Sequence, residues 1–233
     1  MSSDLLTELG KTLDVIATDP KIRVVVLAGN GKAFCAGHDL GEMREDTNHK
    51  SIADLFDLCS RVMLSLTRIP QPVIARVHGM AAAAGCQMVA TCDLAIAAEG
   101  ARFATSGINL GLFCATPMVA ITRNMSRKHA MEMLMTGDFI DAETACQWGL
   151  VNHAVPIDQL DDAVMDLAQK IASKLPVAVA EGKRLFYRQL EAAMNVAYEQ
   201  ASDTITRNMM DSDAQAGIDA FLQKRPRPDW TPK

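Results

Sequence analysis

Residues 73–87 read Val73-Ile74-Ala75-Arg76-Val77-His78-Gly79-Met80-Ala81-Ala82-Ala83-Ala84-Gly85-Cys86-Gln87. The first five residues form a short, mostly apolar run that predicts a strand. The small residues that follow allow a ligand to approach the main chain closely. A helix that starts near Ala84 would direct its N–H groups and its positive end towards an anion. The stretch therefore predicts an α/β fold with a binding loop at the carboxyl end of a strand.

A similar unit precedes this stretch in the chain. Residues 23–28 form another short apolar run, which is typical of a strand buried on both faces in a parallel sheet. The loop 31–40 follows it directly. Apolar residues at helical spacing predict a helix over 51–68, and another short strand is expected at 93–97. Strands that alternate with helices imply right-handed βαβ crossovers. Neither loop contains the GxxxxGK[ST] or GxGxxG pattern, so a nucleotide-binding fold is not indicated.

The rest of the chain has mainly helical periodicity. A helix is expected around Leu6–Ile16, and a further short strand is expected at 150–155. After Pro117 the apolar spacing predicts helices in six segments, 117–124, 127–136, 141–148, 157–173, 177–189 and 191–222.

The composition narrows the class of protein. The chain has 233 residues, of which 49% are hydrophobic and 22% charged, as in soluble globular domains. Its net charge of −5 argues against nucleic-acid or anionic-membrane partners. The six cysteines form no CxxC pair and the five histidines are scattered, so no metal site is predicted. Cysteines in apolar stretches and the lack of a recognisable targeting pattern lead us to expect a cytoplasmic protein with reduced thiols.

The two loops resemble those of the enoyl-CoA hydratase/isomerase (crotonase) family. The resemblance rests on Ala33–Leu40, Pro72–Ala75 and Gly79–Gln87. Further matches follow in the family's order across nearly the whole chain, at Cys92–Ala97, Phe103–Gly111, Thr136-Gly137, Ala142, Ala145, Gly149–Val151 and Phe221–Arg225. Residues Phe103–Cys114 and the tail resemble one poorly characterised branch of the family most closely.

The resemblance implies a ββα spiral. Residues 1–170 would form the spiral core that binds CoA thioesters, and residues 171–233 a helical oligomerisation region. Such regions build trimers, often paired into hexamers, so a homotrimer or homohexamer is expected. Family members usually begin with a strand hairpin, whereas this sequence starts at the helix that follows it. The expected consequence is an exposed sheet edge.

The resemblance also implies an acyl-CoA substrate and no separate cofactor, because coenzyme A enters as part of the substrate. The thioester oxygen would lie in an oxyanion hole formed by the backbone N–H groups of His38 and Ala84. Such donors must be fixed about 3 Å from the oxygen on which charge develops. The residues expected to border the substrate are Ala36, His38, Asp39, Leu40, Gly41, Ala84 and Cys114.

Two catalytic positions depart from the family pattern. The glutamates that hydratases use for proton transfer correspond to Gln87 and Gly107. Neither residue has a group that titrates, so neither carries a proton in catalysis. Gln87 would either orient a water or the thioester oxygen, or only fill space. Cys114 would be either a nucleophile or a buried structural thiol. The His38 imidazole would either line the CoA channel or act as an acid.

Two functions therefore remain in competition. One is an acyl-CoA enzyme of hydratase/isomerase type whose proton transfer is weakened or altered. The other is an acyl-CoA-binding protein without turnover, or a different reaction of the family. Gln87 and Gly107 separate them, because the first function needs an acid or base from elsewhere in the chain. RNA binding, known in one branch of the family, is disfavoured by the negative net charge.

Overall fold

The computed structural model describes residues 1–230 and confirms an α/β architecture with two four-stranded sheets. The first sheet is entirely parallel and contains, in spatial order, β1 (Val25–Ala28), β3 (Val73–Val77), β5 (Leu94–Ala98) and β8 (His153–Val155). The second contains β2 (Ala33–Cys35), β4 (Met80–Ala82), β6 (Arg102–Ala104) and β7 (Ile140–Asp141), of which only β7 runs antiparallel to its neighbour.

Some segments that the sequence predicted as one strand followed by a loop contain two strands, one in each sheet. Strand β1 in the first sheet is followed directly by β2 in the second, and β3 and β5 are followed in the same way by β4 and β6. The predicted loops at 31–40 and 79–87 therefore each contain a short strand. The local sequence did not reveal these strands, because strands of three residues are too short to show periodicity.

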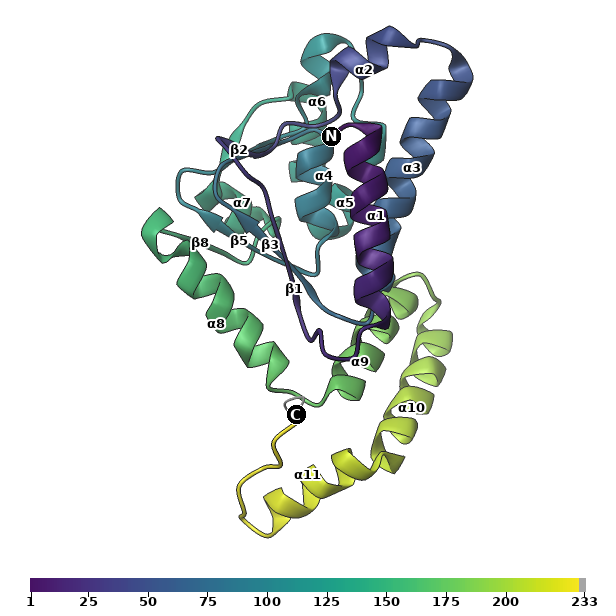
Figure 1. The fold of residues 1–233 in the computed structure, drawn as a ribbon, viewed down its shortest axis with the longest axis vertical. Helices are drawn as coiled ribbons and strands as arrows, with labels where there is room; N and C mark the ends of the chain where they lie inside the picture. Colours follow the sequence, from purple (N-terminus) through teal and green to yellow (C-terminus); the bar gives the residue numbers. More distant parts are fainter. Residues whose placement is uncertain (231–233) are drawn as a thin grey trace.

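Helices surround the sheets (Figure 1). Those of the N-terminal half are α1 (Ser3–Thr18), α2 (Leu40–Glu45), α3 (His49–Arg68), α4 (Ala84–Thr91), the 3₁₀ helix η1 (Ser106–Leu110) and α5 (Ala115–Asn124). They are followed by α6 (Arg127–Thr136), α7 (Ala142–Trp148), the 3₁₀ helix η2 (Ile157–Gln159), α8 (Leu160–Ala172), α9 (Pro176–Leu190), α10 (Met194–Met210) and α11 (Ser212–Leu222). The segment predicted as one helix over 191–222 is divided at Asp211, whose carboxylate caps α11 by accepting the N–H groups of Asp213 and Ala214.

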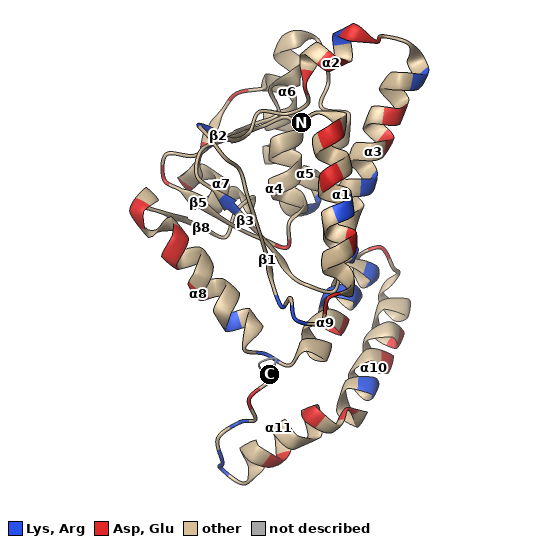
Figure 2. Cartoon of the chain, viewed as in Figure 1, with Lys and Arg blue, Asp and Glu red and all other residues tan. Residues whose placement is uncertain are grey.

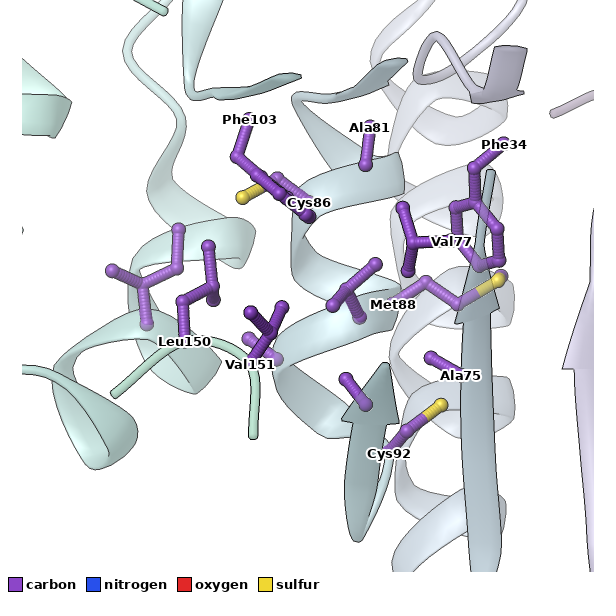
Figure 3. Packing of buried hydrophobic residues seen from close by; sticks show 14 of the residues in the cluster. Phe34, Ala75, Val77, Ala81, Cys86, Met88, Cys92, Phe103, Leu150 and Val151 are labelled. Carbon is purple, nitrogen blue, oxygen red and sulfur yellow. The ribbon is translucent and has the colours of Figure 1, made fainter. Parts of the chain in front are cut away.

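The central strands β3 and β5 of the first sheet are largely buried on both faces. Val26 and Ala28 of β1 are exposed because β1 lies at the edge of the sheet, so the prediction of a strand buried on both faces at 23–28 is wrong. Val73, Ala75 and Val77 belong to the main hydrophobic core, which also includes residues of α1, α3 and α4. Figure 3 shows part of this core, with Cys86 and Met88 of α4 among its members. The alternate residue Ile74 packs on the opposite face with Leu160 and other residues of α8. Packing on both faces fixes the strand ends, and therefore the loops that follow them.

The C-terminal helices extend from this core. Figure 1 shows α10 and α11 lying away from the two sheets, below α9. Their large apolar side chains are widely exposed, including Met194, Tyr198, Phe221 and Leu222. The division into residues 1–170 and 171–233 stays a prediction, and positions 231–233 of the second part lie outside the described residues. Within residues 1–230, every helix is too short or too polar to cross a membrane.

Candidate active site

Three loops meet at one edge of the second sheet. They follow β2, β4 and β6, which are neighbours in that sheet and run parallel. The first loop carries His38, the second leads into α4 at Ala84, and the third carries Gly107 in η1. Because the carboxyl ends of parallel strands lie at the same edge, the sheet brings these three predicted positions together.

The first two loops are in close contact. A Cβ placed on Gly37 would lie 3.1 Å from the Cβ of Ala83 and 3.7 Å from the backbone nitrogen of Ala84. Gly37 has a φ of 105°, in the region that favours glycine. Ala83 has φ 49° and ψ −117°, an unfavourable conformation that costs about 1–3 kcal/mol. Its N–H donates to the carbonyl of Ala104 at 2.9 Å, which helps to hold the turn in place.

Two backbone donors at this contact are free to bind a ligand. Among the hydrogen bonds of residues 1–230, none has the N–H of His38 or of Ala84 as its donor. Ala84 is the first residue of α4, so its N–H belongs to the positive end of that helix. Helix α4 contains no charged residue, as Figure 2 shows, so no side chain of the helix neutralises this end. The site can therefore accommodate a partly negative oxygen.

The His38 side chain is half-buried beside Phe56, with the ring centroids 5.3 Å apart in an edge-to-face contact. Both ring nitrogens are enclosed and have no hydrogen-bond partner among the described residues. Burial lowers the pKa of this imidazole, because the charged form loses its hydration. A neutral ring at pH 7 fits a role in lining the site better than a role as an acid.

Gln87 lies one helical turn after Ala84, on the same side of α4. Its side chain is buried, and its Oε1 has no hydrogen-bond partner in the described part of the chain. Its amide is therefore a polar group held beside the helix N-terminus, as orientation of a ligand requires. It cannot supply the charge change of a general base.

Gly107 and Cys114 are in direct contact. A Cβ on Gly107 would lie 2.9 Å from the Cys114 Sγ and 2.7 Å from the carbonyl oxygen of Leu112. Burial raises the pKa of the Cys114 thiol, and a hydrogen bond from the Gly107 backbone only partly offsets this. The thiol is therefore protonated at neutral pH, which argues against a nucleophilic thiolate. The sulfur occupies the space beside Gly107.

The remaining predicted residues lie on the outer part of the first loop. Ala36, Asp39, Leu40 and Gly41 are exposed. The Asp39 carboxylate caps α2 by accepting the N–H groups of Gly41 at 2.8 Å and Glu42 at 3.3 Å. This cap fixes the course of the chain after His38.

A buried polar cluster at the other end of α4 was not predicted. Asp93 lies two residues after the last residue of α4 and accepts hydrogen bonds from Lys183 and Tyr187 of α9. Burial lowers the pKa of Lys183, although the Asp93 charge acts in the opposite direction. The apolar spacing of 177–189 predicted the helix but gave no sign that its lysine is buried. Separately, a cavity of about 330 Å³ lies between α1, α8 and α9, and none of the predicted site residues lines it.

Sequence and structure comparisons identify the family and the fold. The family model described as "Enoyl-CoA hydratase/isomerase" matches residues 1–233, and the chain belongs to this family. The mouse protein "Enoyl-CoA hydratase domain-containing protein 3, mitochondrial" is 42% identical over 99% of this chain and 74% of its own length. This relative confirms the branch that Phe103–Cys114 and the tail indicated.

Two crystal structures are similar along nearly the full chain. An enoyl-CoA hydratase from Mycobacterium smegmatis superposes with a TM-score of 0.97 and 52% identity, covering 100% of this chain and 90% of that one. The human enoyl-CoA hydratase domain-containing protein 3 gives a TM-score of 0.94 and 42% identity, covering 97% and 90%. The crotonase fold expected from the sequence is therefore confirmed.

The expected cytoplasmic location is wrong on this comparison, because the human, mouse and rat relatives are all named mitochondrial. The physical reason is that targeting segments are removed before or after folding and do not contribute to the domain's core. Net charge and cysteine placement in a folded domain therefore carry little information about its compartment.

Proposed function

We propose that this protein binds acyl-CoA thioesters and stabilises a thioester enolate, with the thioester oxygen between the backbone N–H groups of His38 and Ala84. The observation that carries the proposal is this pair of unpaired donors on adjoining loops, one of them at a helix N-terminus. Charge that develops on the oxygen would meet fixed dipoles rather than mobile water. Coenzyme A enters as part of the substrate, and Ala36, Asp39, Leu40 and Gly41 border it at the exposed side of the loop.

The reaction is of enoyl-CoA hydratase/isomerase type with an atypical site. Gln87 orients the bound thioester or a water, and Cys114 closes the wall of the pocket beside Gly107. A positioned acid or base contributes about 10²–10⁴ in rate, and neither Gln87 nor Gly107 supplies one. Hydration of crotonyl-CoA should therefore be much slower than the enzyme median of about 10 s⁻¹.

The second candidate is an acyl-CoA-binding protein without turnover. The lack of a titratable side chain at positions 87 and 107 favours it, together with the protonated Cys114 thiol. Loss of crotonyl-CoA absorbance at high protein concentration separates the two candidates. Either candidate would act as a homotrimer or homohexamer, which we propose from the exposed apolar surface of α10 and α11.

The oxyanion hole is tested by altering the ligand rather than the protein. Butyryl-CoA has the thioester oxygen, and the thioether butyl-CoA lacks only that atom. Two backbone hydrogen bonds of about 0.5–1.5 kcal/mol each would be lost, so calorimetry should show binding roughly tenfold to a hundredfold weaker for the thioether. Equal affinities would overturn the proposal.

A variant that removes the Ala84 donor is a less direct test. Ala84→Pro deletes the N–H, and it should reduce the preference for the thioester. However, a residue before proline strongly favours extended backbone. Ala83, with φ 49° and ψ −117°, would have to change conformation. An unchanged unfolding curve for this variant is therefore a required control.

A further inference from the structure

The buried cluster behind α4 is not accounted for by ligand binding. The Lys183 Nζ lies 2.6 Å from Asp93 Oδ2, and their side chains are only 6% and 14% exposed. Asp93 Oδ2 also accepts the backbone N–H of Val73 at 2.7 Å, and its Oδ1 accepts the Tyr187 hydroxyl at 2.8 Å. Removing such groups from water costs several kcal/mol per ion, so the cluster needs a structural or functional reason.

The cluster ties four segments to helix α9. Lys183 donates to the carbonyl of Leu66 at 2.7 Å, in the last turn of α3, and to that of Gln71 at 2.9 Å. Val73 begins β3, and Asp93 lies in the short connection between α4 and β5. The positive ammonium group is also well placed beside the negative C-terminal ends of α3 and α4. Lys183 thus holds the end of α3, the loop at Gln71 and the connection after α4, and Asp93 holds the start of β3.

Helix α4 connects this cluster to the candidate active site. Helix α4 has eight residues and is about 12 Å long, and Asp93 lies two residues after its last residue, Thr91. At the site end, a Cβ on Gly85 would lie 2.1 Å from the Cys35 carbonyl oxygen, so α4 presses directly on β2. Because a helix is stiff along its axis, the position of its C-terminal end, beside Asp93, influences where the Ala84 N–H lies relative to the N–H of His38.

We propose that Lys183, Asp93 and Tyr187 are positioning residues, which hold α4 so that its N-terminal N–H group is aligned for the ligand's thioester oxygen. The inference rests on the proposed oxyanion hole and deepens it. The three residues act through the helix and touch no substrate. Helix α9, on which Lys183 and Tyr187 lie, also packs against α10. The C-terminal helices are therefore linked mechanically to the donors of the site.

The test measures alignment separately from stability. We define the selectivity as the dissociation constant of butyl-CoA thioether divided by that of butyryl-CoA, measured on the full chain. Lys183→Met should lower this ratio on the order of tenfold, because a displacement of about 1 Å can reduce the effect of an oriented group by up to 10². Tyr187→Phe, which removes one hydroxyl, should lower it less. The affinity for free coenzyme A should not change.

Two further variants keep the test decisive. Asp93→Asn combined with Lys183→Met removes both charges, and neutral replacement of a buried pair is often tolerated. It should lower the ratio even when the single lysine variant folds poorly. Arg76→Met removes a different ion pair, which links β3 to Asp161 of α8 and does not involve α4, so its ratio should equal that of the wild type.

The outcomes separate the two proposals. A high wild-type ratio that is unchanged in Tyr187→Phe and in the double variant overturns the positioning role and leaves the oxyanion hole intact. A wild-type ratio of one overturns the oxyanion hole, and the positioning role with it. A fall in the ratio for the cluster variants, with none for Arg76→Met, supports both.

Discussion

The His38 ring is a neutral, enclosed group beside a proposed backbone donor. Its burial should make the free energy of unfolding depend on pH. Burial holds its folded-state pKa below the unfolded value of about 6.5. As pH falls through about 6.5, the unfolded chain takes up the proton first, so the free energy of unfolding decreases. The full free energy of unfolding is therefore present above about pH 6.5, where the His38 ring is neutral in both states, and part of it is lost below that pH.

Chemical unfolding at pH 7.5 and 5.5 checks this prediction. His38→Gln should show a smaller loss of stability on acidification than the wild type. His49→Gln, on the exposed start of α3, is the matched control and should behave like the wild type. An identical pH dependence in the wild type and His38→Gln would contradict the prediction.

Gly107 is kept small by its neighbours rather than by its backbone conformation. Its φ is not in the left-handed region, but a Cβ would lie within 2.9 Å of Cys114 Sγ and 2.7 Å of the Leu112 carbonyl oxygen. We expect Gly107→Ala to lower the free energy of unfolding by about 1–3 kcal/mol through overpacking. Urea denaturation measures this change in the free energy of unfolding. A glutamate at this position would require the 107–114 turn to open.

The matched control for this variant lies in α9. A Cβ on Gly182 would meet nothing within 4 Å, so Gly182→Ala should raise stability by up to about 1 kcal/mol through helix propensity. If both alanine variants shift stability in the same direction, the steric explanation for Gly107 is wrong.

At the scale of elements, we expect the contact between α4 and β2 to set the width of the proposed oxyanion hole. The Gly85 backbone lies against the Cys35 carbonyl so closely that an added Cβ would be 2.1 Å from the oxygen and 2.8 Å from the carbonyl carbon. The contact is between the backbones of Gly85 and Cys35, and a backbone cannot make room for a Cβ as a flexible side chain can. Gly85→Ala should therefore push α4 away from β2 and separate the His38 and Ala84 donors.

The expected result is a loss of selectivity for butyryl-CoA over butyl-CoA thioether, together with a stability loss of about 1–3 kcal/mol. Calorimetry gives the first value and urea denaturation the second. A stability-matched control is Val89→Ala, which removes core volume from α4 one helical turn beyond the close backbone contact at Gly85. Retained selectivity in Gly85→Ala would show that this contact does not set the hole.

At the scale of the whole molecule, the C-terminal helices present more apolar surface than a soluble monomer usually exposes. Tyr198 is 70% exposed, Phe221 82% and Leu222 70%. Exposed patches of this kind are typical of protein interfaces. We expect light scattering to give a trimer or hexamer of the 25.2 kDa chain.

Charged substitutions locate the interface. Tyr198→Asp combined with Phe221→Asp should shift the population towards monomer at micromolar concentration, because a buried unpaired charge is costly. Val15→Asp, at an exposed position on α1, serves as the control. A wild-type monomer under these conditions would overturn the proposed assembly.

The sequence by itself determined the alternation of strands and helices, the loops after the first strands and the helix start at Ala84. These are local features, because side-chain periodicity and small residues act within one element. It also determined that positions 87 and 107 carry no titratable group, since residue identity alone decides that.

Only the tertiary structure decided how distant segments meet. It added a second sheet, two of whose short strands lie in the predicted loops, enclosed His38, placed the Cys114 sulfur against Gly107 and joined Asp93 to Tyr187 across 94 residues of sequence. Each of these depends on burial and on hydrogen bonds between elements. The periodicity of a single element cannot encode such contacts, because they form only when the chain packs around a common core.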